Sequence, residues 1–174
     1  MRKIILSIVV LAMMFSAGCS RQELECDVCV YGGTSAGVIA AYAVAQQGKS
    51  VLLIEPGYRL GGMSSGGLGQ TDIGNKQVVK GLSLDFYRRV GAHYDALEHW
   101  IFEPSVAEKV FNDYIERGNV EVLYGHRILD ARKDDTHITS IKLENTAKMC
   151  GRTNIKAKVF IDCSYEGDLM ARSG

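Results

Sequence analysis

The sequence predicts an α/β fold, a parallel sheet with helices on both faces, and three stretches of its first third lead to this prediction. Residues 27–31 (DVCVY) are mostly apolar and run into small residues. Residues 35–47 have the apolar spacing of a helix, which Gly48 ends. Residues 50–54 (SVLLI) are almost continuously apolar, as a parallel strand buried on both faces is. Strand, helix and strand within about 30 residues make one βαβ unit, whose two strands are parallel.

Composition limits the class of protein. The chain has 174 residues, enough for about one domain. Hydrophobic residues make up 47% and charged residues 23%, as in ordinary globular proteins. The 20 basic and 20 acidic residues cancel to a formal net charge of zero. Because a nucleic-acid-binding surface is usually strongly basic, we expect no nucleic-acid partner.

The first residues have the pattern of an export signal. Arg2 and Lys3 precede an apolar run at 4–17 that ends in small residues. A membrane-spanning helix needs about 20 apolar residues, so this run is too short to be one. A basic start, a short apolar stretch and small residues are typical of a signal peptide, which we assign to residues 1–18.

The end of this segment, Ser16-Ala17-Gly18-Cys19, resembles the lipobox of bacterial lipoproteins. In that pattern the cysteine becomes the lipidated first residue of the mature chain. The resemblance implies that Cys19 carries lipid and anchors the protein to a membrane of the cell envelope. Ser16 stands where the pattern usually has a large aliphatic residue, and an ordinary secretory signal is the alternative. Residues 19–26 are polar, and we interpret them as a short tether.

Residues 30–41 (VYGGTSAGVIAA) contain the candidate binding motif. They match the G-x-G-x-x-G fingerprint of dinucleotide-binding turns with Gly32 and Gly37 at the first and third glycine positions, and with Thr34 at the second. The motif lies between a predicted strand and a predicted helix, and Glu55 follows Gly32 by 23 residues. This setting is much more specific than the glycines alone.

Each position of the motif has a physical role. Gly32 permits the tight turn, and Gly37 lets the helix approach the strand closely. The free amides at the start of the helix, around Ser35 to Gly37, favour a diphosphate. Glu55 accepts hydrogen bonds from ribose hydroxyls and repels a 2′-phosphate, which argues against NADP. Thr34 is compatible if its Cβ points aside, and its hydroxyl could then donate to a phosphate oxygen. A turn without a ligand is the alternative.

The segment 56–72 (PGYRLGGMSSGGLGQTD) decides between NAD and FAD. Five glycines fall between residues 61 and 69. Flexible linkers are usually polar, whereas this segment also contains Leu60, Met63 and Leu68. Glycine-rich backbone can lie against a second large, flat part of the ligand, as a flavin requires. We therefore expect FAD.

Residues 77–118 predict a helical insertion. Leu82, Phe86 and Val90 recur at a helical period, and Pro104 opens a second helix. No metal site is expected in the chain.

Cys26 and Cys29 make a C-x-x-C pattern. Residues three apart on a strand point to opposite faces, so we interpret the pair as small apolar fillers. The four histidines show no metal-ligand spacing on a common face.

In combination, VYGGTSAGVIAA, Glu55 and LGGMSSGGLGQTD resemble the N-terminal part of FAD-dependent oxidoreductases of the glutathione-reductase-like class. More narrowly, they resemble a bacterial group of exported proteins placed near the flavoprotein component of heterodisulfide reductase. Three further stretches match this group: 100–111 (WIFEPSVAEKVF), 120–128 (VEVLYGHRI) and 159–174 (VFIDCSYEGDLMARSG). Threonine at the second glycine position is common in it.

The resemblance implies a Rossmann-like FAD-binding domain over residues 27–174, with 120–128 as a third parallel strand and 128–160 as a small antiparallel β-meander. It also implies the cofactor contacts. These are Gly32, Gly33, Thr34, Ser35, Ala36 and Gly37 at the pyrophosphate, Glu55 at the ribose, Arg59, Gly61, Gly62 and Met63 at the flavin half, Ile128 at adenine through its backbone, and Ser164 beside the cofactor. Ser64, Ser65, Asp72 and Cys163 are candidates for tuning the flavin, and no catalytic base is assigned.

The function expected from this resemblance is that of an FAD-dependent oxidoreductase. It would move a hydride or two electrons between its flavin and a small-molecule substrate, with an electron acceptor that the sequence does not identify. One alternative is an electron-carrying flavoprotein of the heterodisulfide reductase type, with a 4Fe–4S cluster beyond residue 174. Another is a non-catalytic nucleotide-binding lipoprotein. The resemblance implies a longer protein, so we expect the last parallel strand, a second flavin contact and the substrate domain beyond residue 174.

Overall fold

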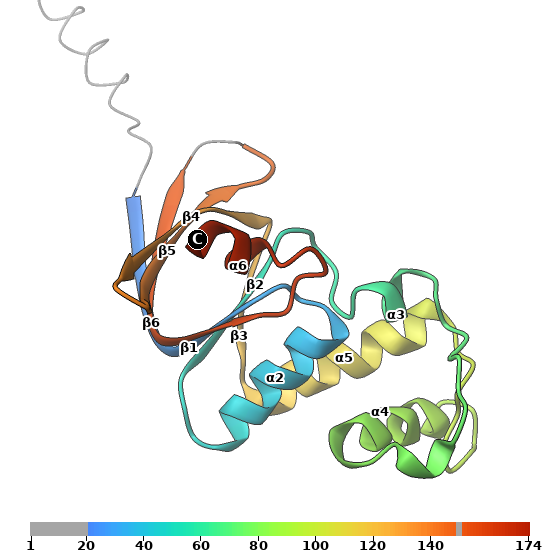
Figure 1. The fold of residues 1–174 in the computed structure, drawn as a ribbon. Coiled ribbons are helices and arrows are strands. Elements are labelled where there is room, and N and C mark those ends of the chain that lie inside the picture. The colour runs from blue at the N-terminus through green and yellow to red at the C-terminus, as the bar shows by residue number, and fades with distance from the viewer. Residues whose placement is uncertain (1–20, 149–150) are drawn as a thin grey trace, which may run out of the picture.

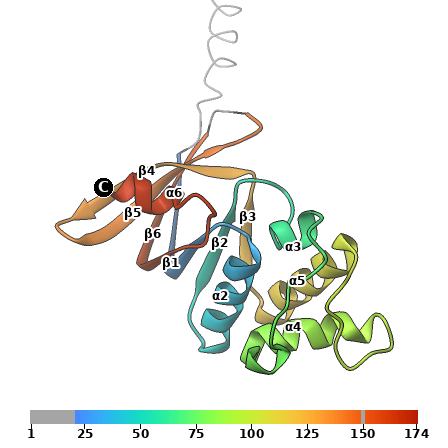
Figure 2. The same ribbon diagram turned by 45° about the vertical axis from the view of Figure 1, so that its right-hand side comes forward.

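The computed structural model describes residues 21–148 and 151–174, which form an α/β fold around one six-stranded sheet (Figures 1 and 2). The expected α/β class is therefore confirmed, while the signal segment 1–18 and Cys19 lie outside the described residues. The strands are β1 (Arg21–Tyr31), β2 (Val51–Glu55), β3 (Glu121–Tyr124), β4 (His126–Asp134), β5 (His137–Asn145) and β6 (Arg152–Asp162). The helices are α2 (Ser35–Gln46), α3 (Met63–Gly66), α4 (Gly81–Ala92), α5 (Pro104–Gly118) and α6 (Asp168–Ser173), with a 3-10 turn η1 (Lys76–Val78).

The sheet has a parallel half and an antiparallel half, in the order β3-β2-β1-β6-β5-β4. β1 lies between β2 and β6 and is parallel to both, and β3 extends the parallel half beside β2. The unit β1–α2–β2 is the βαβ unit that the sequence predicts. β4, β5 and β6 form the expected antiparallel meander, and β6 belongs to both halves as one uninterrupted strand.

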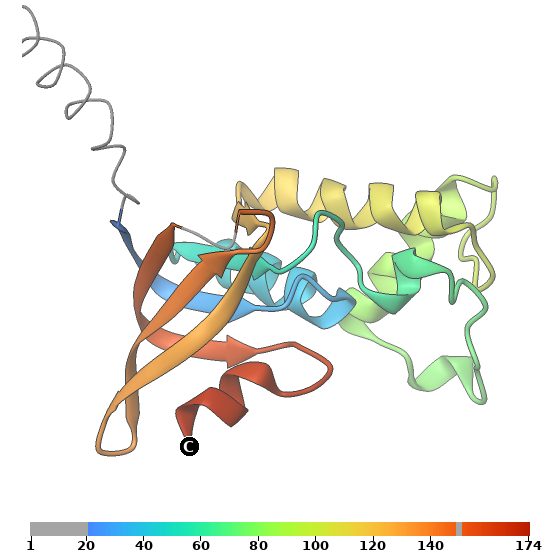
Figure 3. The ribbon, with the colours of Figure 1, turned by 90° about the horizontal axis from the view of Figure 1, so that it is seen from above.

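Helices cover both faces of the sheet. One core cluster joins β1 and β2 to α2, α4 and α5, with Val30, Leu53 and Phe111 at its centre. A second cluster on the other face joins the meander to α6 through Leu169. Figure 3 shows α5 and α6 on opposite sides of the strands. The carboxyl ends of β1, β2 and β6 remain at one edge, where open α/β sheets bind ligands.

Two sequence-based boundaries are wrong. The expected tether includes residues 21–26, but these form the first half of β1 and pair with residues 152–157 of β6. These residues are mostly polar, but they alternate as a strand does. Leu24 and Cys26 pack on the second core cluster, while their neighbours face away from it. The expected third strand at 120–128 ends at Tyr124.

Beyond Tyr124, Gly125 has a φ of +64° and turns the chain into β4.

The C-x-x-C pair is a packing feature, as expected, although the two side chains do not face opposite ways. Cys29 is buried in the second cluster and Cys26 packs against the same cluster. Between them, the amides of Asp27 and Val28 both donate to Ser50 O at 3.1 Å. The alternation of side chains along β1 changes at this point, because Leu24 and Cys26 pack on the second cluster whereas Val28 packs on the first. Burial raises the pKa of Cys26 to about 11, so its thiol is protonated at neutral pH.

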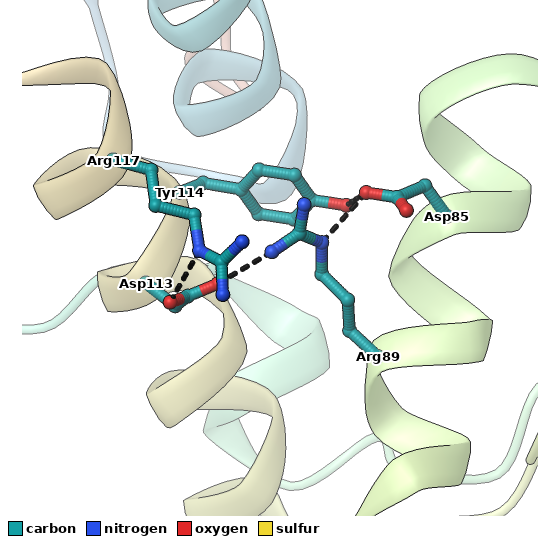
Figure 4. Close-up of polar contacts among 5 residues, drawn as sticks. All are labelled: Asp85, Arg89, Asp113, Tyr114 and Arg117. Carbon is teal, nitrogen blue, oxygen red and sulfur yellow. Dashed lines mark hydrogen bonds and ion pairs between the residues drawn. The ribbon is translucent and has the colours of Figure 1, made fainter.

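The expected helical insertion consists of η1, α4 and α5 with a loop at 93–103. A polar network joins α4 to α5 (Figure 4). Tyr114 Oη donates to Asp85 at 2.6 Å, and Arg89 pairs with both Asp85 (2.6 Å) and Asp113 (2.5 Å). Arg117 donates to the second oxygen of Asp113 at 2.8 Å.

Tyr114 is the centre of this network. Its ring is fully buried, meets Tyr42 of α2 edge to face at 5.0 Å, and lies 4.5 Å from the Arg89 guanidinium. Burial and the hydrogen bond to Asp85 raise the pKa of Tyr114. Burial by itself would raise the pKa of Asp85, but hydrogen bonds from Tyr114 and Arg89 outweigh it and lower that pKa. The network thus holds the insertion against α2, whose first turn belongs to the candidate site.

We predict that Tyr114→Phe lowers the free energy of unfolding by about 1–2 kcal/mol, because a buried hydroxyl loses its charged acceptor. Urea titration followed by the fluorescence of Trp100 measures this loss. Trp100 is the single tryptophan and stacks on Tyr87 of α4 at 3.8 Å, so it reports on the insertion. Tyr124→Phe is the control, because the Tyr124 hydroxyl has no hydrogen bond within the described chain, and it should change stability by less than about 0.5 kcal/mol. Equal effects of the two variants would contradict a stabilising network.

Candidate dinucleotide-binding site

The turn between β1 and α2 is a tight crossing of backbone over backbone. Gly32 has a φ of +98°, and its amide donates to Ile54 O at 2.8 Å. A Cβ on Gly32 would lie 2.7 Å from Ser164 N, and one on Gly37 would lie 1.9 Å from Gly32 O. Both positions therefore require glycine, for the turn and for the close approach of helix to strand that the sequence predicts.

Thr34 stands at the second glycine position of the motif, and its side chain is held by two hydrogen bonds. It is the N-cap of α2: its Oγ1 accepts a hydrogen bond from Gly37 N at 3.2 Å and donates to Cys163 O at 2.9 Å. The side chain is 7% exposed and points toward the end of β6. The Cβ does point aside, as the motif requires. However, the hydroxyl proton is already used, so the expectation that it donates to a phosphate oxygen is wrong for this conformation.

Glu55 points at the turn from the end of β2. Its Oε2 accepts from Gly33 N at 2.8 Å and its Oε1 accepts from Gly57 N at 2.6 Å. Two backbone amides therefore fix the carboxylate beside the motif. Each carboxylate oxygen has a further lone pair, which leaves an acceptor for each of two ribose hydroxyls.

The segment after Glu55 runs along the turn. Gly61 N donates to Gly33 O at 2.8 Å, and Gly61 and Thr34 form an isolated parallel bridge. Gly61 has a φ of +99°, and a Cβ there would meet the Phe111 ring at 2.3 Å. Gly62 and the exposed Met63 follow at the start of α3. The backbone of this segment thus forms a second wall beside the motif.

Arg59 does not join this wall. Its guanidinium forms an ion pair with Glu108 of α5, with Nη2 to Oε2 at 2.7 Å and Nε to Oε1 at 3.1 Å, and Nη2 also donates to Ser65 O. The expected place of Arg59 beside the flavin half stays a prediction. The nearby acid on α5 orients the side chain toward the helix instead.

The two distal residues of the expected set behave differently. Ser164 lies against Gly32, and its Oγ donates to Asp162 Oδ1 at 2.6 Å, so it belongs to the turn region. Ile128 is buried in the second core cluster, and its amide donates to Tyr31 Oη at 3.1 Å. That donor is therefore not free for the expected adenine contact.

A cavity of about 320 Å³ opens beside the first turn of α2. Its lining joins α2 to α3, α4 and α5: Ser35, Ala36, Ile39, Ser64, Ser83, Phe86, Tyr87 and Phe111. The amides of Ser35 and Ala36, the first of the helix, have no acceptor within it. The positive end of the helix dipole lies there, and no acidic residue occupies the first turn. This chemistry fits a diphosphate with Glu55 at the adjoining sugar.

The candidate tuning residues have different surroundings. Ser64 lines the cavity, whereas Ser65 is buried and its hydroxyl bonds to the carbonyls of Leu60 and Gly62. Asp72 is exposed. Cys163 is half-buried at the turn, and burial together with Asp162 raises its pKa, so its thiol is protonated and weakly nucleophilic.

Tyr165 is a site residue that sequence reasoning missed. Its hydroxyl accepts a hydrogen bond from Met63 N at 2.7 Å and fills the space beside Gly62. A large aromatic residue directly after Ser164 is the signal that could have found it. In the described ranges no group of three or more potential metal ligands occurs, and no helix there is both long and apolar enough to cross a membrane.

The turn, the carboxylate and the cavity define an α/β protein of the dinucleotide-binding flavoprotein class. The chain belongs to the FAD-dependent oxidoreductase family, because residues 27–174 match the model of the family described as FAD dependent oxidoreductase. The cofactor of this family is FAD, as the sequence predicts. The comparison with curated proteins gives no match.

Solved structures share the fold. The FAD-dependent halogenase CndH, a myxobacterial chondrochloren halogenase, is similar with a TM-score of 0.62 and 17% identity over 81% of this chain and 37% of its own. THI4 of Thermovibrio ammonificans is similar with a TM-score of 0.62 and 16% identity, over 99% of this chain and 69% of its own. The p-nitrophenol 4-monooxygenase PnpA of Pseudomonas putida is similar with a TM-score of 0.60 and 14% identity, over 88% of this chain and 44% of its own. The chain thus spans between about a third and two thirds of these proteins, and the likeness concerns the fold.

We predict that Thr34→Val lowers the free energy of unfolding by about 1–3 kcal/mol, because it keeps the shape but removes the helix cap and the bond to Cys163 O. Thr34→Ser keeps the hydroxyl and should lose about 1 kcal/mol or less, for one buried methyl group. Chemical denaturation of both variants without cofactor measures the difference. If Thr34→Val and Thr34→Ser have the same free energy of unfolding, the Thr34 hydroxyl does not hold the turn to β6.

Proposed function

We propose that this chain belongs to the FAD-binding domain of an enzyme that transfers a hydride or two electrons between flavin and a small-molecule substrate. The observation that carries the proposal is the Glu55 carboxylate, fixed by the amides of Gly33 and Gly57 beside the glycine turn. Bound FAD would supply the redox chemistry, and the protein supplies binding and orientation.

The residues of this chain divide the binding between them. The first-turn amides of α2, at Ser35 and Ala36, meet the diphosphate, and Glu55 accepts from the ribose of the adenosine half. The backbone of the glycine-rich wall at 61–63 lies against the flavin half, and glycine is needed at 61 and 62 because a side chain there would collide with Phe111 or Tyr165. The protonated Cys163 and the cavity-lining Ser64 offer weak hydrogen-bond donors near that half.

Within the family, we place the chain near the exported bacterial group that neighbours the flavoprotein component of heterodisulfide reductase. Support comes from the variant turn with Thr34 and from VFIDCSYEGDLMARSG at 159–174. The export signal at 1–18 and the lipobox-like Cys19 belong to the same proposal, which puts the protein on a membrane of the cell envelope.

We predict that the full-length protein binds FAD and that Glu55→Gln weakens this binding at least tenfold. The amide of glutamine cannot accept at both ends, so its NH₂ group faces the N–H of Gly33 or Gly57 and one ribose acceptor is lost. Visible absorbance and quenching of flavin fluorescence on titration measure the dissociation constant, where tenfold is about 1.4 kcal/mol.

Glu121→Gln is the matched control. It removes the same charge from the exposed start of β3, at the edge of the sheet opposite the site, and should leave the affinity for FAD unchanged. Equal binding by the Glu55 and Glu121 variants would refute the role of Glu55. A wild-type protein that is colourless and does not bind added FAD would refute the proposed function.

The lipid anchor has its own test. We predict that cells fed an alkyne-tagged fatty acid label the wild-type protein and that Cys19→Ser abolishes the label, because thioether formation needs the thiol. After membrane fractionation, the wild-type protein should be found in the membrane pellet and the Cys19→Ser variant in the supernatant. Labelling that persists in Cys19→Ser would mean that another residue carries the lipid, and no labelling of either protein would favour an ordinary secretory signal.

A further inference from the structure

Tyr165 reaches across the candidate site from the loop between β6 and α6. Its hydroxyl oxygen accepts from Met63 N at 2.7 Å, and a Cβ built on Gly62 would lie 2.2 Å from this oxygen and 3.3 Å from Thr34 Cα. The phenol therefore meets the glycine wall at 61–63 where that wall touches the turn between β1 and α2.

The loop that carries Tyr165 is held on both sides. Asp162 accepts from the amide and the hydroxyl of Ser164, at 3.0 Å and 2.6 Å, and also from Met170 N at 2.9 Å. Asp168 N donates to Ser164 Oγ at 2.9 Å. These bonds hold the loop on both sides of Tyr165, and the bond from Met63 N holds its hydroxyl.

The hydroxyl proton of Tyr165 has no acceptor within the described chain, although its oxygen is fixed by the Met63 amide. Tyr165 is 54% exposed, so part of the residue is accessible to a ligand. A phenol that accepts from a backbone amide can donate its own proton at the same time. Thr34 offers no such donor, because its proton bonds to Cys163 O.

We propose that Tyr165 donates a hydrogen bond to the diphosphate of the bound dinucleotide, as the side-chain donor that Thr34 does not supply. This inference rests on the proposed function, because it takes the diphosphate to lie at the start of α2. Tyr165 and the amides of Ser35 and Ala36 then bind the diphosphate from opposite sides. Gly62 is required because any side chain there would displace the phenol.

The test compares Tyr165→Phe with the wild type in the full-length protein. Titrations with FAD, ADP and adenosine measure affinity for ligands with and without the diphosphate. The variant should bind FAD and ADP about tenfold or more weakly, since a hydrogen bond to a charged group is lost. Its affinity for adenosine should stay the same, and its melting temperature without ligand should fall only slightly, because the lost bond to Met63 N lies at an exposed residue.

Tyr94→Phe is the matched control. The Tyr94 hydroxyl likewise accepts from a backbone amide, Glu103 N at 3.0 Å, and it also donates to the Glu103 carboxylate, but it lies in the loop after α4. This variant should bind all three ligands like the wild type.

Three results would overturn the inference while the wild type still binds FAD. Unchanged affinity of Tyr165→Phe for FAD and ADP would mean that the hydroxyl does not touch the diphosphate. An equal loss for adenosine would mean that Tyr165 acts on the loop and not on the phosphates. Tighter binding of FAD would mean that the phenol blocks the site. A wild type that binds neither FAD nor ADP would overturn the proposed function first, and this inference with it.

Discussion

The crossing of α2 over the end of β1 is the contact on which the candidate site depends. Gly37 and Gly32 come so close that a single Cβ on Gly37 would lie 1.9 Å from Gly32 O. This approach brings the first amides of α2 to the carboxyl edge of the parallel strands, where the ends of β1, β2 and β6 meet. A wider crossing would move the helix dipole away from the Glu55 carboxylate, and the diphosphate and ribose contacts could no longer act on one ligand.

The second constraint is the link between this crossing and β6. Thr34 caps α2 and donates to Cys163 O, while Cys163 N donates to Tyr31 O at 2.8 Å. The end of β6 is therefore fixed to the end of β1 on both sides of the turn. A glycine at position 34 would leave Cys163 O without this donor. The threonine thus forms a rigid junction between the two strands while its Cβ points aside.

Sequence reasoning succeeded where one local rule determined the structure. The run at 50–54, the helix after Thr34 and the glycines at 32 and 37 follow from burial, spacing and backbone sterics, and all appear in the fold. It failed where a partner distant in sequence decided the outcome. Residues 21–26 look like a polar tether because their partner, β6, lies more than a hundred residues away. Likewise, the contacts of Arg59 with Glu108 and of the Ile128 amide with the Tyr31 hydroxyl join residues far apart in sequence, and local pattern does not reveal them.

The candidate site is built from two separate parts of the chain, and only one of them can be recognised from local sequence. The turn, Glu55 and the glycine wall come from one continuous stretch, so a local fingerprint reveals them. The loop after β6 closes the other side, and it reaches the site only because β6 lies parallel to β1 in the sheet. Since the Thr34 hydroxyl is bonded to Cys163 O, the side-chain donor that we propose for the diphosphate comes from the loop after β6. The placement of Tyr165 against Met63 and Gly62 provides this donor without a further change in the backbone.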